Sequence, residues 1–125
     1  MVIQNVIKLK SLTISGFKSF NSDEHTIEIG DVSVLIGANG AGKSNLVSFF
    51  KMVGYMMTAA LQQYVGEQGG ASSLLHFGPK TTPRLSAKFE FENDAVYNAY
   101  EFSLAHAAQE CLIFAHEILS YPDKK

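Results

Sequence analysis

The chain of 125 residues has few or none of several residue types, and each of these absences excludes a class of protein. It has no tryptophan and one cysteine, Cys111, so it has no internal disulfide framework and fits a reducing compartment. Ten Lys and Arg stand against twelve Asp and Glu, and the net charge of −2 excludes a basic nucleic-acid binder. No apolar run approaches the roughly 18–20 residues of a membrane helix, and no signal-peptide core is visible. We therefore expect a cytoplasmic protein with no membrane partner.

Hydrophobic residues make up 46% of the chain, which excludes disorder as its main state. The length fits one domain at most. Two runs of alternating apolar and polar residues within 6–30 predict strands that pair as an antiparallel ribbon. Alternation returns over 85–119, where three runs predict an antiparallel meander. Its turns are expected at 93–94 and 107–109.

The segment 32–65 is expected to hold a strand, a glycine-rich turn and a long helix. Residues 32–36 are short, β-branched and nearly all apolar, which is typical of a strand buried on both faces. The helix should bury one apolar stripe. Its members recur at spacings of three and four: Leu46, Phe50, Val53, Met57, Leu61 and Tyr64. Phe49, Met56 and Ala60 widen this stripe. The Gly and Pro content of 66–84 predicts a loop, with an apolar island at 74–77.

Between the expected strand and the expected helix, the chain matches the P-loop pattern G-x-x-x-x-G-K-[ST], the Walker A motif. The match is Gly37-Ala38-Asn39-Gly40-Ala41-Gly42-Lys43-Ser44. Its glycines let backbone N–H groups turn inward around phosphate oxygens, and the helix N-terminus adds unsatisfied donors. Lys43 would place a cation on the β- and γ-phosphates, and Ser44 would offer its hydroxyl to Mg²⁺. The alternative is a plain glycine-rich helix cap, which needs no Lys-Ser pair at this spacing.

Three segments together resemble the start of an SMC/RecF-type ABC ATPase head. They are residues 12–20 (LTISGFKSF), 27–29 (IEI) and 34–45 (VLIGANGAGKSN). The resemblance is strong over about residues 6–60 and loose over 74–119. It implies an α/β fold, the N-terminal lobe of a P-loop NTPase, in which a strand–P-loop–helix unit is combined with antiparallel β-strands.

The resemblance also implies the ligands. ATP and Mg²⁺ would bind at residues 37–44, with Asn45 beside them. Members of the family often contact the nucleotide from the segment that matches Lys18-Ser19-Phe20 as well. The alternative is that Phe17 and Phe20 are core residues and Lys18 is a solvated charge. For the full-length protein, the resemblance implies a homodimer formed head to head around ATP and a role in DNA repair, maintenance or phage defence.

The hydrolytic residues of such a head are not found in this chain. A Walker B motif needs an apolar strand that ends in Asp-Glu. The nearest candidate, residues 112–117, has His116 at the metal-side position, so we interpret it as a strand with an outward Glu117. No LSGGQ-like signature follows. Gln109 is a candidate Q-loop ligand for the metal, with a plain turn residue as the alternative. We expect no catalytic residue here and assign ATP hydrolysis to the full-length protein.

The same residues leave one other function open and argue against two more. A stand-alone nucleotide- or phosphate-binding regulatory module without hydrolysis would share the P-loop and stays open. A P-loop GTPase needs Asn-Lys-x-Asp and Asp-x-x-Gly, and neither occurs. A small kinase would need acceptor-site arginines, and Arg84 is the single arginine. The remaining candidates for a metal, His106, Cys111 and His116, lack the close ligand pairs of a zinc site.

Overall fold

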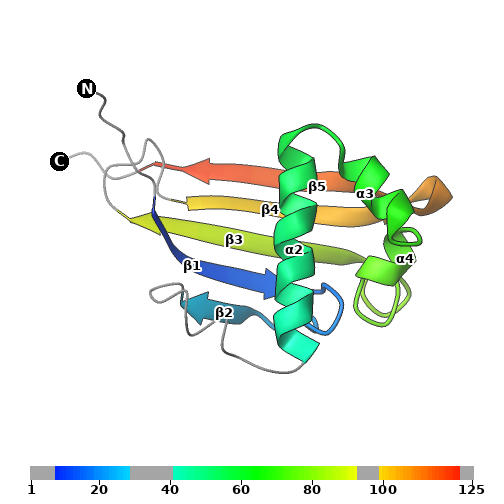
Figure 1. Ribbon diagram of the computed structural model, residues 1–125, viewed down its shortest axis with the longest axis horizontal. Coiled ribbons are helices and arrows are strands. Elements are labelled where there is room, and N and C mark those ends of the chain that lie inside the picture. The colour runs from blue at the N-terminus through cyan, green and yellow to red at the C-terminus, as the bar shows by residue number, and fades with distance from the viewer. Residues whose placement is uncertain (1–7, 29–40, 93–98, 122–125) are drawn as a thin grey trace.

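The computed structural model describes residues 8–28, 41–92 and 99–121. In these residues, five strands form one sheet in the order β2-β1-β3-β4-β5. The strands are β1 (Lys8–Ser15), β2 (His25–Glu28), β3 (Arg84–Glu92), β4 (Ala99–Ala107) and β5 (Cys111–Ser120). Figure 1 shows helix α2 (Ala41–Met57) lying across one face of this sheet. Two short helices, α3 (Leu61–Glu67) and α4 (Ala71–Leu74), lie at one end of the sheet.

The expected antiparallel pairing of the strands is confirmed. β1 pairs with β2 and also with β3, so the N-terminal ribbon joins the later meander in one sheet. β4 pairs with β3 and β5, again antiparallel. A three-residue 3₁₀ turn, η1 (Ala108–Glu110), connects β4 to β5. The strand expected over 32–36 and the turn expected at 93–94 lie outside the described residues.

The hydrophobic core lies between α2 and the covered face of the sheet. Side chains from β1, β3 and β4 alternate toward this face, because successive residues of a strand point to opposite sides. Its fully buried members include Leu12, Ile14, Leu85, Phe102 and Leu104. The opposite face carries polar side chains, such as the hydroxyls of Ser86 and Ser103, which lie 2.7 Å apart.

The predicted helical stripe was correct at Leu46, Leu61 and Tyr64, which are buried, and wrong at Phe50 and Met57. Phe50 and Met57 are 38% and 80% exposed, whereas Phe49 and Met52 are fully buried. Apolar residues stand side by side in this helix, at Phe49-Phe50 and Met56-Met57. Two stripes of similar spacing were therefore available, and packing against the sheet selected the one that contains Leu46, Phe49 and Met52.

The long helix expected to reach residue 65 is two helices. α2 ends in a Schellman motif, in which Ala59 adopts a left-handed φ of +60°. The N–H of Ala60 donates to the carbonyl of Tyr55 at 2.8 Å, and that of Ala59 donates to Met56 at 3.2 Å. The chain turns there, and α3 starts at Leu61 in a new direction.

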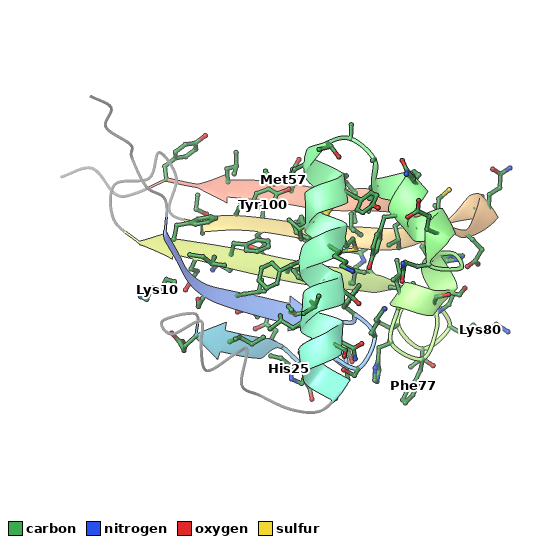
Figure 2. All side chains as sticks on the ribbon, in the orientation of Figure 1. Lys10, His25, Met57, Phe77, Lys80 and Tyr100 are labelled. Carbon is green, nitrogen blue, oxygen red and sulfur yellow. The ribbon has the colours of Figure 1, made fainter. Side chains whose placement is uncertain are left out.

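The segment 66–84, expected as a loop, contains the short helix α4. Its apolar island divides: Leu74 and Leu75 are buried, and Phe77 is 83% exposed. Figure 2 shows Phe77 projecting away from the body of the molecule. The buried half of the island forms an isolated bridge, Leu75 with Phe17, which ties this segment to the residues that follow β1.

Candidate functional site

Helix α2 begins inside the P-loop motif, at Ala41. The first N–H groups of a helix have no intrahelical acceptor, so they and the helix dipole favour an anion there. Ser44 is exposed in this first turn, which leaves its hydroxyl accessible. Residues 37–40 of the motif lie outside the described residues, and for Lys43 only the helical backbone is described.

The residues Lys18 and Ser19 lie against the first two turns of α2. The side-chain amide of Asn45 donates to the hydroxyl of Ser19 at 2.5 Å. The ammonium of Lys18 donates to the hydroxyl of Ser48 at 3.4 Å. Two segments that are 26 and 30 positions apart in the chain therefore meet beside the start of the P-loop helix. The structure brings together the P-loop helix and the candidates singled out after β1.

The two aromatic residues of the same segment have different surroundings. Phe17 is fully buried, and its ring meets the ring of Phe49 edge to face with centroids 5.4 Å apart. Phe20 is partly buried against the core. Phe17 is thus a core residue, and Phe20 packs at the edge of the core. Phe17 anchors the segment on α2, so that Lys18 and Ser19 are held at the helix surface.

Ser48 also connects α2 to α3. The phenol of Tyr64 donates to the backbone carbonyl of Ser48 at 3.1 Å. Burial raises the pKa of Tyr64 above its ordinary value of 10.0, so the phenol stays protonated and can donate throughout the neutral range. The second turn of α2 is therefore fixed from two sides, by Lys18 and by Tyr64.

Gln109 lies in a different part of the fold. It has a left-handed φ of +65° in the turn between β4 and β5. Its neighbour Glu110 accepts a hydrogen bond from the N–H of Ser72 at 2.9 Å, which places this turn against α4. A metal role for Gln109 stays a prediction.

The stretch 112–117, considered for a Walker B motif, lies within strand β5. Glu117 accepts a hydrogen bond of 2.5 Å from the phenol of Tyr100 on β4. Among the residues that the structure describes, no group of three or more His, Cys, Asp or Glu side chains could hold a metal ion. In the same residues, no helix is both long and apolar enough to cross a membrane.

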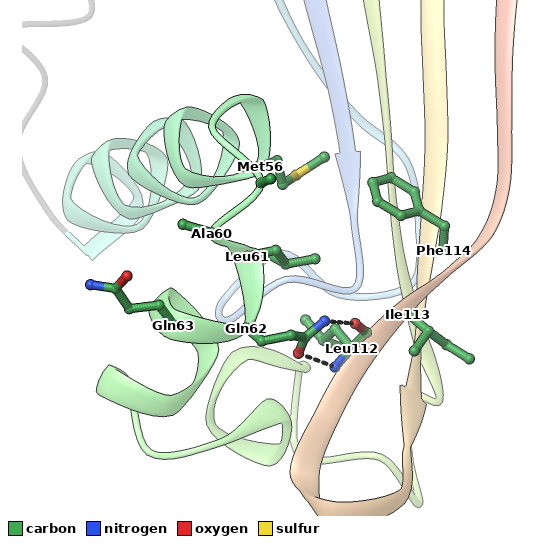
Figure 3. Close-up of a pocket in the computed structure, with 9 residues that line it drawn as sticks. Met56, Ala60, Leu61, Gln62, Gln63, Leu112, Ile113 and Phe114 are labelled. Carbon is green, nitrogen blue, oxygen red and sulfur yellow. Dashed lines mark hydrogen bonds between the residues drawn. The ribbon is translucent and has the colours of Figure 1, made fainter.

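An apolar groove opens at the far end of α2, between the start of α3 and β5. Figure 3 shows Met56 and Leu61 on one side and Ile113 and Phe114 on the other. The side-chain amide of Gln62 closes its floor, donating to the carbonyl of Leu112 at 2.6 Å. With a rise of about 1.5 Å per residue, this groove lies about 22 Å along α2 from the P-loop end. It is separate from the nucleotide candidates.

Residues 11–112 match a family whose description is AAA domain. The match spans well over half of the chain, so the chain belongs to the AAA domain family. A stretch of 46 residues is 50% identical to the chromosome partition protein Smc of Desulfitobacterium hafniense. This confirms the predicted resemblance to SMC-type proteins. No solved structure matches the chain.

The match to the Smc protein covers 36% of this chain and 4% of that protein. The chain thus corresponds to a small part of the relative.

Sequence reasoning missed one group near the candidate site, His76. Its ring nitrogen Nδ1 lies 2.5 Å from the backbone carbonyl oxygen of Lys18. The sequence offered only an indirect signal, since residues 74–77 stood out as an apolar island inside a Gly- and Pro-rich stretch. Nothing in the sequence placed that island beside residues 16–19, because the bridge between them joins positions 58 apart.

Proposed function

We propose that this chain binds ATP with Mg²⁺ at its P-loop, residues 37–44, as the N-terminal part of a larger SMC/RecF-like ATPase. The observation that carries the proposal is the start of α2 inside the Gly-Lys-Ser motif, with Lys18 and Ser19 held beside it. Membership of the AAA domain family and the similarity to an Smc protein support it.

Each proposed contact follows from the chemistry of the residue. Backbone N–H groups of residues 37–44 would surround the phosphates, and Lys43 would neutralise their charge. The exposed hydroxyl of Ser44 would complete the shell of a Mg²⁺ ion whose other ligands are water and phosphate oxygens. Asn45, Lys18 and Ser19 would add polar contacts at the edge of the site. Gln109 is a second candidate ligand for the metal, and the only support for it is that an amide oxygen can coordinate Mg²⁺.

For the full-length protein, we propose ATP-dependent pairing of two heads and a role with DNA, in repair, maintenance or phage defence. The net charge of −2 on this chain means that DNA contacts would come from other parts of that protein. A stand-alone nucleotide-binding module without hydrolysis remains the second candidate, because the P-loop serves both equally.

The test is a titration of the purified chain with a fluorescent ATP analogue, with and without Mg²⁺. We expect Lys43→Ala to abolish binding while the far-UV circular dichroism stays unchanged. Lys51→Ala is the matched control, because Lys51 is an exposed lysine two turns further along the same helix. Binding by the Lys43 variant equal to that of the unmodified chain would show that the P-loop assignment is wrong.

A further inference from the structure

The segment after β1 and the segment after α4 are joined by three hydrogen bonds. The N–H of Lys18 donates to the carbonyl of Leu74 at 2.8 Å, and the N–H of His76 donates to the carbonyl of Gly16 at 3.0 Å. The third bond uses the His76 ring, whose Nδ1 lies 2.5 Å from the carbonyl oxygen of Lys18. A carbonyl oxygen can only accept, so Nδ1 carries the proton.

The backbone of Lys18 needs this support. Its φ is +49°, in the left-handed region that residues with a Cβ seldom adopt. A left-handed residue persists where its surroundings hold it on several sides. Here the N–H and the carbonyl of Lys18 are both engaged by the Leu74–His76 segment, so the peptide groups on either side of its Cα are fixed.

The conformation of Lys18 decides where two side chains go. Its ammonium reaches Ser48 on α2 at 3.4 Å, and the next residue, Ser19, accepts from Asn45 at 2.5 Å. Asn45 directly follows the P-loop serine, Ser44. A change of φ at Lys18 would move both side chains away from the phosphate-binding end of the helix.

We propose that His76 is a positioning residue for nucleotide binding: its Nδ1–H holds the carbonyl of Lys18 and so sets Lys18 and Ser19 against the P-loop helix. This inference rests on the proposed function. Fixing these side chains before the nucleotide arrives removes part of the conformational entropy cost of binding. His76 itself touches no ligand in this role.

A purely structural role for the ring is less consistent with its surroundings. The two segments are already held together by Phe17, Leu74 and Leu75, all of which are buried. The His76 side chain is only partly buried, and its ring packs against the exposed ring of Phe77 at 4.2 Å between centroids. The ring therefore adds little to the core, and its directed bond goes to Lys18.

The test compares three variants with the unmodified chain by titration with the fluorescent ATP analogue and by thermal unfolding. His76→Phe keeps a ring of similar shape and removes the donor. We expect it to weaken binding about 3- to 10-fold, the effect of one net hydrogen bond. His76→Asn restores an N–H donor near the position of Nδ1 and should recover most of the affinity. Lys43→Ala is the non-binding control, which gives the background fluorescence signal.

The same His76→Phe change is then made in a chain that already carries Lys18→Ala and Ser19→Ala. If His76 acts through these two side chains, its loss has no further effect on affinity there, although any loss of thermal stability persists. An equal 3- to 10-fold loss in both backgrounds overturns the proposal, as does unchanged affinity of His76→Phe in a chain that binds ATP.

The same experiments also cover a chain that binds no ATP and a His76→Phe variant that does not fold. If the unmodified chain binds no ATP, the proposed function itself fails, and the positioning role fails with it. If His76→Phe loses its cooperative unfolding transition, His76→Asn is compared with His76→Asp at neutral pH. The two side chains share a shape, but the ionised carboxylate cannot donate. Equal affinity of these two variants then overturns the proposal.

Discussion

The rings of Phe49 on α2 and Phe102 on β4 lie nearly parallel, at 4° to one another, with their centroids 6.5 Å apart. Both side chains are fully buried. Phe49 also meets Phe17 edge to face and Phe89 at 6.1 Å, so one side chain of the helix packs against two strands and the segment after β1. This cluster fixes the rotation of α2 about its axis, and with it the direction in which the first turn presents the P-loop serine.

The first prediction concerns this cluster. Phe49→Ala should lower the free energy of unfolding by about 3–5 kcal/mol, because it removes a large buried ring and leaves a cavity. Urea unfolding followed by circular dichroism measures the change.

The control for this prediction is the next residue. Phe50 is 38% exposed, so Phe50→Ala should cost clearly less than Phe49→Ala. Equal losses for the two variants would contradict the orientation of α2 that the structure shows.

The second prediction concerns Gly16. Its φ is +78°, and a Cβ at this position would lie 2.6 Å from the carbonyl oxygen of Arg84. Gly16→Ala should therefore destabilise the fold by about 1–3 kcal/mol, through backbone strain and displacement of β3. Thermal unfolding of the purified variant provides the measurement.

Gly54 is the matched control for the glycine prediction. It lies within α2, and a Cβ added there meets nothing within 4 Å. Gly54→Ala should raise stability by up to about 1 kcal/mol, because alanine is the better helix former. If Gly16→Ala is as stable as the unmodified chain, that result contradicts the close approach of Gly16 to β3.

The third prediction is a pH dependence carried by Glu110. A hydrogen bond from His106 at 3.0 Å, followed by bonds from Ser72, lowers the pKa of Glu110 from 4.5 to about 2. A carboxyl whose pKa is lower in the folded state stabilises that state above its unfolded pKa. The contribution of Glu110 should therefore be complete above about pH 4.5 and disappear as the pH falls toward 2.

Urea unfolding at pH 7, 4 and 3 checks this expectation. Glu110→Gln removes the titrating group while keeping a side chain of the same length. Its stability should fall less between pH 7 and pH 3 than that of the unmodified chain. Parallel pH profiles for the two proteins would show that the carboxylate contributes no folding energy in this range.

The fourth prediction concerns turnover. We expect the purified chain to bind ATP and to hydrolyse it negligibly, because no apolar run in its sequence leads into Asp-Glu and the candidate stretch in β5 holds His116 and Glu117 instead. Release of inorganic phosphate, with Lys43→Ala as the blank, measures this. Robust turnover that Lys43→Ala abolishes would contradict the assignment of hydrolysis to other parts of a longer protein.

Much of the sheet could be predicted from the sequence, because strands that are half buried alternate apolar and polar residues. That pattern gave the antiparallel strands now seen as β1 and β2 and as β3 to β5. The helix after the P-loop was predicted as well. Its buried face was predicted only in part, because Phe49 and Phe50 each fit a stripe with helical spacing. Only contact with Phe102 and Phe17 distinguishes them.

The candidate site also has one part that the sequence predicts and one part that it does not. The residues of the P-loop are contiguous. The motif, with its glycines at fixed spacing before Lys43 and Ser44, can therefore be recognised from the sequence alone. The neighbours of the helix are not contiguous with it. Ser19 meets Asn45, and His76 meets Lys18, only in the folded chain, where the segment after β1 lies against both α2 and the residues after α4.

The sequence by itself thus determined the match to the P-loop motif, the alternation of the strands and the likeness to SMC-type ATPases. The tertiary structure decided which side of α2 is buried, where the helix ends and which residues stand beside its first turns. The physical reason is the range of the interactions. Local patterns encode backbone conformation, whereas ring packing and hydrogen bonds between distant segments exist only once the chain has folded.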